Sequence, residues 1–246
     1  MRDKAIVFTA YNRIDYLEQT IDAWSKVDNL YKFDIYFSVE PSDKIDVIKS
    51  MLKKFGDKVY SNVHVKYNEE LYGCAKNTWK SLNYLFNRYD FVILAEDDIV
   101  PSQDIADYFI YLEEKYRDID EVAIISASNR AGENKPTQVV RTPGFPGLIW
   151  GTWSKYWKNY FRDTWDFGYT TGTPETPQSG WDWNLTLRIM PKNNLWCIYP
   201  VASRSQHIGI NGLHCNEEIF DETTSPSFKE RHEWKELVEV CLLYTS

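Results

Sequence analysis

Short apolar runs alternate with amphipathic stretches through residues 4–95. The apolar run over residues 4–10 is followed by residues 13–26, in which apolar side chains recur at helical spacing. The alternation repeats, and it predicts strands over 33–39, 62–66 and 91–95 and helices over 43–54 and 73–88. Strands separated by helical segments are typical of βαβ units. We therefore predict an α/β fold with a mostly parallel central sheet flanked by helices.

The pattern changes after residue 98. A helix is predicted over 101–116 and a strand over 122–127, followed by loops rich in Gly, Pro and Trp. Residues 168–180 hold three Gly, two Pro and four Thr, a composition that favours a connection or lid over a packed element. A last amphipathic helix is predicted over 227–243, with Trp234, Leu237, Val238 and Cys241 on one side.

Length and composition favour one globular domain over residues 1–246. Hydrophobic residues make up 43% and charged residues 26% of the chain, which excludes disorder, collagen and coiled coil as descriptions of the whole. Aromatic residues reach 16%, and seven of the ten Trp fall within residues 150–196. That bias indicates either a dense core or a stacking surface.

Charge and cysteine usage narrow the possible partners and locations. The net charge is −8 and no basic stripe is visible, so the sequence shows no basic surface for nucleic-acid phosphates. A phosphate-bearing ligand would need a local positive charge such as a metal ion. Four cysteines without CxxC spacing indicate reduced thiols. No apolar stretch approaches a signal-peptide core or the roughly 20 residues of a membrane span. We expect a cytoplasmic protein, with peripheral membrane association left open.

The string FVILAEDD, residues 91–98, is the most informative one in the chain. Its five apolar residues suit a strand buried on both faces, and Glu96, Asp97 and Asp98 follow directly. Ligands of open α/β sheets bind outside the carboxyl ends of the strands, and crowded carboxylates are stable when they share Mg²⁺ or Mn²⁺. The alternative is a solvated turn that caps the next helix, although Pro101 and Ser102 already mark the start of that helix.

An apolar strand that ends in an acidic triplet, after a first-strand loop TAYNR, resembles the glycosyltransferases of the GT-A fold. More narrowly, the chain resembles the N-acetylglucosaminyltransferase I family, which adds GlcNAc to mannose. Further support comes from AEDDIVPSQDIADYF, RTPGFPGLIWGTWSKYW, GWDW and YPVASRSQHIGINGLH. The resemblance covers residues 4–220. It implies a Rossmann-like nucleotide-sugar-binding half over 1–98 and an acceptor and catalytic half over 99–220, and the amphipathic pattern adds a helical tail over 221–246.

The resemblance assigns the acidic triplet to metal and sugar. In the family the last acid is the direct metal ligand, and the first two hold ribose and donor sugar. This implies that Asp98 binds Mn²⁺ or Mg²⁺ and that Glu96 and Asp97 contact sugar hydroxyls. Side-chain alternation along a strand puts Glu96 and Asp98 on the same side, which is compatible with a shared ligand.

The same resemblance implies contacts to the nucleotide. It puts Ala10 and Tyr11 near the base and Arg13 toward the diphosphate, although Arg13 also fits an ordinary surface position on a helix. Glu40 aligns with an acid that reads uracil, with Glu here where Asp is expected. Asn77 falls where the family has a His near the nucleotide.

The base that deprotonates the acceptor is assigned to Asp182, which matches the acidic position of the family's Trp-Asp motif. The alternative is that Asp182 caps a helix running to residue 190. The flanking rings of Trp181 and Trp183 offer either an apolar platform for sugar or core packing.

Two histidines and an arginine complete the candidates, all within SRSQHIGINGLH. We expect His207 to complete the metal shell and His214 to contact the diphosphate, against the alternative that each is structural. Arg204 matches a family position that leads into a loop ordered by donor binding, so it joins the donor contacts.

Together these residues predict an inverting, metal-dependent transferase that moves a sugar, by resemblance GlcNAc, from a UDP-sugar to a glycan hydroxyl. One rival is a nucleotidyltransferase acting on sugar phosphates, which should show a Gly-rich basic loop after the first strand; TAYNRIDYL lacks one. The other is a non-catalytic carbohydrate-binding protein that uses the Trp cluster as a stacking surface.

Overall fold

The structure is a computed structural model that describes residues 3–130, 132–145, 147–168, 180–210, 220–221 and 224–240. Among the predicted features, His214 and most of the connection over 168–180 lie outside the described residues.

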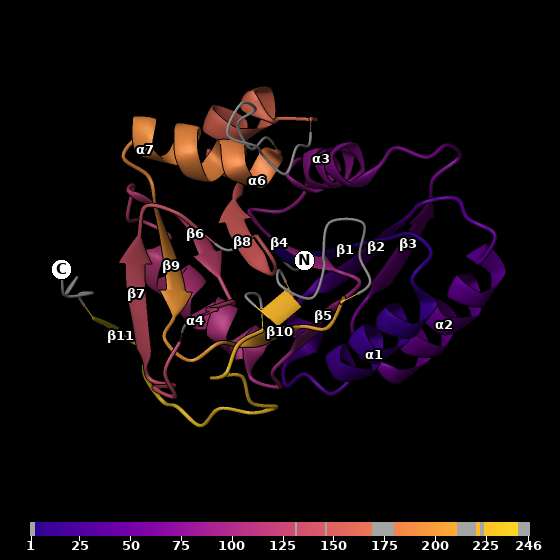
Figure 1. Cartoon of the computed structure of the whole chain (residues 1–246), viewed down its shortest axis with the longest axis horizontal. Helices are drawn as coiled ribbons and strands as arrows, with labels where there is room; N and C mark the ends of the chain where they lie inside the picture. The colour runs from indigo at the N-terminus through magenta and orange to yellow at the C-terminus, as the bar shows by residue number, and fades with distance from the viewer. Residues whose placement is uncertain are drawn as a thin grey trace.

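The first part of the chain alternates strands and helices as predicted. The elements are β1 (Lys4–Ala10), α1 (Ile14–Trp24), η1 (Leu30–Lys32), β2 (Asp34–Val39), α2 (Ile45–Lys58), β3 (Val63–Tyr67), α3 (Cys74–Leu85) and β4 (Phe91–Glu96). Strands β4, β1, β2 and β3 are neighbours in that order, and all of their pairings are parallel. In Figure 1, α1 and α2 lie on one side of these strands and α3 on the other.

The second part adds shorter strands to the same sheet. The elements are β5 (Ile99–Pro101), α4 (Ile105–Tyr116), β6 (Val122–Ser126), β7 (Gln138–Thr142), β8 (Trp150–Trp153), α5 (Ser154–Tyr156), η2 (Trp157–Phe161), η3 (Arg162–Thr164), α6 (Trp181–Asn184), η4 (Leu185–Ile189), α7 (Met190–Lys192), β9 (Trp196–Pro200), β10 (Ser205–His207) and β11 (Val238–Val240). Among the described residues the large sheet has the order β11-β7-β9-β6-β8-β4-β1-β2-β3. Since β8 runs antiparallel between β4 and β6, the sheet is mixed but mostly parallel, as the fold prediction required.

A small second sheet carries the chain away from the acidic triplet. Strand β5 pairs antiparallel with β10, with Ile99 opposite His207 and Pro101 opposite Ser205. The helix predicted over 101–116 therefore begins only at Ile105, because the preceding residues are extended in this pairing. The pairing brings His207 next to the residue that follows Asp98.

The predicted helix over 227–243 is wrong in its described part. Residues 224–237 form an irregular strap, and β11 then pairs parallel with β7. The strap is anchored at separate points: the Trp234 indole N–H donates to Asp104, Gln103 N–H donates to the Glu230 carbonyl, and Leu237 is buried. Ser225, Ser227 and His232 are buried in this segment, so its inward positions are polar as well as apolar and do not form one apolar helical face.

Most of the tryptophan cluster belongs to the core. Trp150, Trp153, Trp157, Trp165 and Trp181 are buried, and the Trp181 ring is stacked on Trp165 with ring centroids 4.9 Å apart. Trp183 differs, because 37% of its surface is exposed. Of the two interpretations of the cluster, dense core is therefore correct for these five rings.

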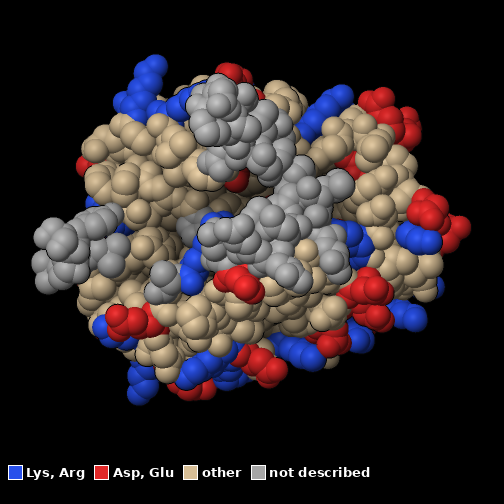
Figure 2. Space-filling view, viewed as in Figure 1, with Lys and Arg blue, Asp and Glu red and all other residues tan. Residues whose placement is uncertain are grey.

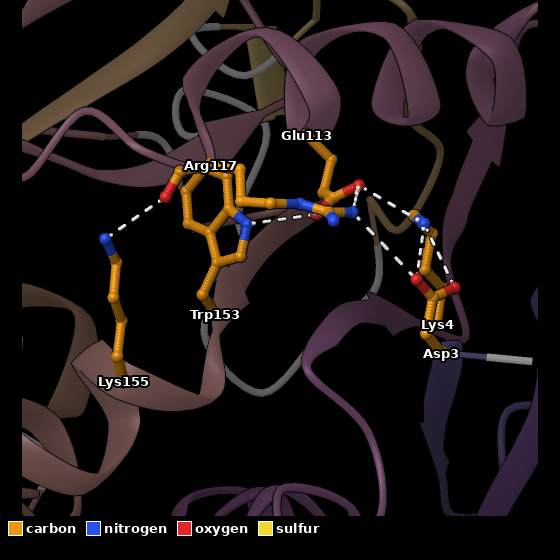
Figure 3. A network of polar contacts seen from close by, with 6 residues as sticks. All are labelled: Asp3, Lys4, Glu113, Arg117, Trp153 and Lys155. Carbon is orange, nitrogen blue, oxygen red and sulfur yellow. Dashed lines mark hydrogen bonds and ion pairs between the residues drawn. The ribbon is translucent and has the colours of Figure 1, made fainter.

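A buried carboxylate links the amino end of β1 to α4 and β8, as Figure 3 shows. Glu113 lies 3.2 Å from Lys4 Nζ, accepts hydrogen bonds from the Arg117 guanidinium, and accepts one from the Trp153 indole N–H at 3.2 Å. Lys4 opens β1 and the acidic triplet closes β4, its parallel neighbour. The network therefore holds the end of the sheet opposite to the candidate site.

Candidate functional site

Polar side chains gather at the carboxyl ends of β1 to β4. Glu96 ends β4 and Asp97 and Asp98 follow it, while Tyr11 and Glu40 directly follow β1 and β2. Backbone hydrogen bonds continue past the strand ends, from Glu40 N to Ala10 O at 2.9 Å and from Asn68 N to Val39 O at 2.8 Å. The strand order therefore brings together candidates that are distant in sequence, at the edge where α/β folds bind ligands.

Arg13 bridges two acids of the triplet. One guanidinium nitrogen donates to Asp97 and another donates to Asp98 Oδ2 at 2.5 Å. Partial burial opposes the charge of Arg13, but the Asp97 and Asp98 carboxylates outweigh it and raise the arginine pKa. Arg13 is therefore a cation at the acidic edge and not an ordinary surface residue of α1.

The three acids differ in their electrostatics. Burial raises the pKa of Asp97 to about 6, although Arg13 opposes the shift. Desolvation, with the neighbouring Asp98 charge, raises the pKa of Glu96 well above its usual value. Asp98 is also buried, but its hydrogen bond to His207 and the charge of Arg13 hold its pKa below the usual value. Asp98 is thus the member of the triplet best kept ionised, as a direct metal ligand must be.

The surroundings of Asp98 fit a divalent cation. Its Oδ1 atom is buried and has no hydrogen-bond partner among the described residues, and His207 Nε2 lies 3.4 Å from Oδ2. The chain also approaches closely at Gly209, where an added Cβ would come within 2.1 Å of Asp98 Oδ2. In the described part of the chain no three His, Cys, Asp or Glu side chains form a metal site by themselves. Mg²⁺ and Mn²⁺ commonly complete their shells with water and substrate phosphates, so one carboxylate with one imidazole is a workable donor set.

Asp182 lies in the first turn of α6, and its charge acts on Glu96 and on Cys74 at the start of α3. Gly147 passes against it: a Cβ on Gly147 would meet the Asp182 Cβ at 3.3 Å. Gly180, which precedes the helix, has φ 146°, a value that L side chains rarely adopt. Gly180 is the N-cap residue and no side chain caps α6, so Asp182 suits the helix N-terminus only through its charge. Its role as the base stays a prediction.

Glu40 and Asn77 belong to one buried network. Both Glu40 carboxylate oxygens accept the Tyr72 backbone N–H, at 3.2 and 3.1 Å. Asn77 accepts from Ser38 Oγ at 2.6 Å and donates to the Ser38 carbonyl at 3.1 Å. Asn68 Nδ2 lies between them, 2.9 Å from Asn77 Oδ1 and 3.4 Å from Glu40 Oε2. The Asn77 amide is therefore engaged within the protein.

Two other sequence candidates, Arg204 and Trp181, are buried among protein groups. Arg204 is fully buried and bonds Asp104 and the carbonyls of Ala202 and Pro136, so its guanidinium ties loops together. Trp181 lies within the aromatic core, whereas the adjacent Trp183 is partly exposed. His214 lies outside the described residues.

Two residues that sequence reasoning missed contact the site. Asn68 directly follows β3, so the rule applied to the acids at the end of β4 would also have selected it. Gly209 lies two residues after His207, but a sequence pattern does not show which glycine permits a close approach to a carboxylate. Figure 2 shows acidic and basic side chains interspersed on one face, with no continuous basic stripe among the described residues there.

Solved structures define the class of the fold as GT-A, the fold of nucleotide-sugar glycosyltransferases. GalNAc-T7 with UDP, GalNAc and Mn²⁺ matches with TM-score 0.58 and 11% identity, over 87% of this chain and 45% of that one. The mannosyltransferase PcManGT from Pyrobaculum calidifontis, in complex with GDP-Man and Mn²⁺, matches with TM-score 0.55 and 15% identity, over 80% and 54%. S. aureus TarS 1-349 in complex with UDP gives TM-score 0.55 and 14% identity, over 80% and 60%.

By sequence, the chain is similar to the alpha-1,3-mannosyl-glycoprotein 2-beta-N-acetylglucosaminyltransferase of Arabidopsis thaliana. It is 27% identical over 229 residues, which cover 85% of this chain and 47% of the relative. The chain thus spans about half the length of the curated relative it matches. The resemblance stated from the motifs is confirmed. No protein-family model matches the chain. No helix among the described residues is long and apolar enough to span a membrane.

Proposed function

We propose that the chain is an inverting glycosyltransferase that moves GlcNAc from UDP-GlcNAc to a glycan hydroxyl with Mn²⁺ or Mg²⁺. The observation that carries this proposal is the acidic triplet with Arg13 at the carboxyl edge of β1 to β4. The GT-A fold supports a nucleotide-sugar donor. The named activity of the Arabidopsis relative supports GlcNAc, and the UDP complexes of TarS and GalNAc-T7 support uridine.

In this proposal the donor is bound through its diphosphate and through the hydroxyls of its ribose and its sugar. Asp98 and His207 would hold the divalent ion, whose bound charge stabilises the leaving diphosphate. Arg13 is 31% exposed in its side chain, so it can exchange part of its contact with Asp98 for a donor phosphate. Glu96 and Asp97, with raised pKa values, suit hydrogen bonds to ribose and sugar hydroxyls.

The acceptor is activated from the opposite side of the donor sugar. Asp182 takes the proton of the attacking hydroxyl as that oxygen bonds to the anomeric carbon, and the bond from that carbon to the diphosphate breaks. One displacement of this kind inverts the anomeric centre. The partly exposed ring of Trp183, next to Asp182, offers an apolar face for the acceptor sugar.

Thermal unfolding with UDP, GDP and CMP, each with and without Mn²⁺, tests donor binding. We expect a Mn²⁺-dependent rise in the unfolding midpoint with UDP, since ligand at a hundredfold excess over Kd adds about 2.7 kcal/mol. The shift should disappear in Asp98→Asn and persist in Asp57→Asn, an exposed acid on α2. Stabilisation by free glycans with no response to any nucleotide would instead favour a carbohydrate-binding protein.

A further inference from the structure

One polar atom near the acidic edge lacks the partner that its burial demands. Asn68 follows β3 and is 7% exposed, and its side-chain Oδ1 has no hydrogen-bond partner among the described residues. A buried acceptor without a donor carries the cost of lost hydration and gains nothing in return. Such an atom needs a donor from outside the chain, which is either an ordered water or a ligand.

The orientation of the Asn68 amide follows from its neighbours. Asn77 Oδ1 must be an acceptor, because it receives the Ser38 hydroxyl while its own Nδ2 donates to the Ser38 carbonyl. Asn68 therefore points Nδ2 toward Asn77 Oδ1 at 2.9 Å, with Glu40 Oε2 at 3.4 Å. Turning the amide over would set its oxygen against two other oxygens. Asn68 Oδ1 is consequently the side-chain atom without a hydrogen-bond donor among the described residues.

The family resemblance assigns the recognition of uracil to Glu40. The acceptor atoms of Glu40 differ from Asn68 Oδ1 in having donors within the chain. Both of its oxygens already accept the Tyr72 backbone N–H, and one also faces Asn68 Nδ2. Each Glu40 oxygen thus has at least one donor within the chain, whereas Asn68 Oδ1 has none among the described residues. Both residues lie at the strand ends where Ala10 and Tyr11 also lie.

We propose that Asn68 Oδ1 accepts a hydrogen bond from the ring N–H of the donor's nucleobase, N3–H in uracil, and that Ser38 and Asn77 are positioning residues for it. This inference rests on the proposed use of a UDP-sugar. Because Oδ1 is buried, base binding would include a local rearrangement around Asn68, whose neighbouring segment is residues 69–73. In this segment Leu71 is 58% exposed and Tyr72 N–H is bonded to Glu40.

Isothermal titration with UDP and N3-methyl-UDP, both with Mn²⁺, tests the pairing. N3-methylation removes the N–H, so the wild-type protein should bind N3-methyl-UDP at least about tenfold more weakly than UDP. Asn68→Ala should bind UDP about tenfold more weakly than wild type and lose most of the discrimination between the two ligands. Ser38→Ala should reduce the same discrimination, and Asn87→Ala, on the exposed end of the α3 region, should leave it unchanged.

The results separate the inference from the function on which it rests. Equal affinity of wild type for UDP and N3-methyl-UDP would overturn the pairing without any variant. So would unchanged UDP affinity in folded Asn68→Ala, or loss of discrimination in Glu40→Gln instead of Asn68→Ala. If folded wild type binds no nucleoside diphosphate at all, the proposed function itself fails. Circular dichroism of each ligand-free variant confirms that the comparison uses folded protein.

Discussion

At the residue scale, the site depends on how closely other groups approach Asp98. Arg13, His207 and the Gly209 backbone all approach Asp98 Oδ2, whereas Oδ1 has no hydrogen-bond partner among the described residues. The main chain also ties the two segments, since Ile208 N–H donates to the Asp98 carbonyl at 2.9 Å. Small changes in this neighbourhood should therefore alter ligand binding more than folding.

Gly209→Ala tests this close approach. A Cβ there would lie 2.1 Å from Asp98 Oδ2, so the carboxylate must move and Mn²⁺-dependent binding of UDP should weaken about tenfold or more. Titration calorimetry of the variant with UDP and Mn²⁺ measures the effect. Gly56→Ala is the matched control, because its Cβ would meet only Val63 at 3.8 Å and should leave binding unchanged. Wild-type affinity in Gly209→Ala would contradict the geometry.

The raised pKa of Asp97 makes a prediction about stability and pH. Burial raises this pKa from 3.8 to about 6, so the protonated carboxyl favours the folded state. That contribution is complete below about pH 4 and is lost as the pH rises through 6. Between pH 4 and pH 7 the wild-type free energy of unfolding should fall relative to Asp97→Asn by up to about 3 kcal/mol. Denaturant unfolding in EDTA measures the difference, and parallel curves for the two proteins would contradict it.

At the element scale, the candidate site and the polar network that stabilises the sheet lie at opposite ends of the strands. The acidic triplet lies at the carboxyl end of β4, whereas Glu113 and Lys4 join β1 to α4 at the other end (Figure 3). The short β5–β10 pairing connects Asp98 to His207. The strap over 224–237 packs beside β5 through Gln103 and Asp104. We therefore expect stability and binding to respond to different substitutions.

Glu113→Ala tests that separation. It leaves the buried Lys4 ammonium and the Trp153 indole N–H without their carboxylate, which should cost about 3 kcal/mol of unfolding free energy. Nucleotide affinity of the folded variant should stay at the wild-type value. Glu114→Ala, an exposed neighbour on α4, should change neither quantity. A folded Glu113→Ala protein of normal stability that loses UDP binding would reverse the assignment.

The elements also show what the sequence can predict. The predicted strand over 4–10 matches β1, and the predicted strand over 91–95 matches β4, because a continuous apolar run that ends in carboxylates is typical of a buried strand reaching a ligand-binding edge. The pattern does not predict strands β7 to β9, since runs such as WGTW show no alternation and are buried throughout. The predicted C-terminal helix fails because tertiary anchors at Trp234 and Leu237 outweigh helical periodicity. The orientation of Asn68 depends on Ser38 of β2, on Glu40 after it and on Asn77 of α3, so no local pattern shows it.

At the scale of the whole molecule, two halves meet over one sheet edge. The four parallel strands β4, β1, β2 and β3 supply the acids, Arg13 and the polar network around Glu40, and the later segments supply His207 and Asp182. The proposed donor contacts and the proposed base therefore come from different parts of the chain. The arrangement matches the GT-A fold of the structural relatives.

The measurement that tests this account most directly is the configuration of the product. Wild-type protein, UDP-GlcNAc, Mn²⁺ and a mannose-terminated oligosaccharide should give a β-linked GlcNAc product, identified by the anomeric proton in NMR spectra. Asp182→Asn should bind UDP normally and transfer at least about a hundredfold more slowly. An α-linked product, or transfer by Asp182→Asn at the wild-type rate, would contradict a single displacement assisted by Asp182.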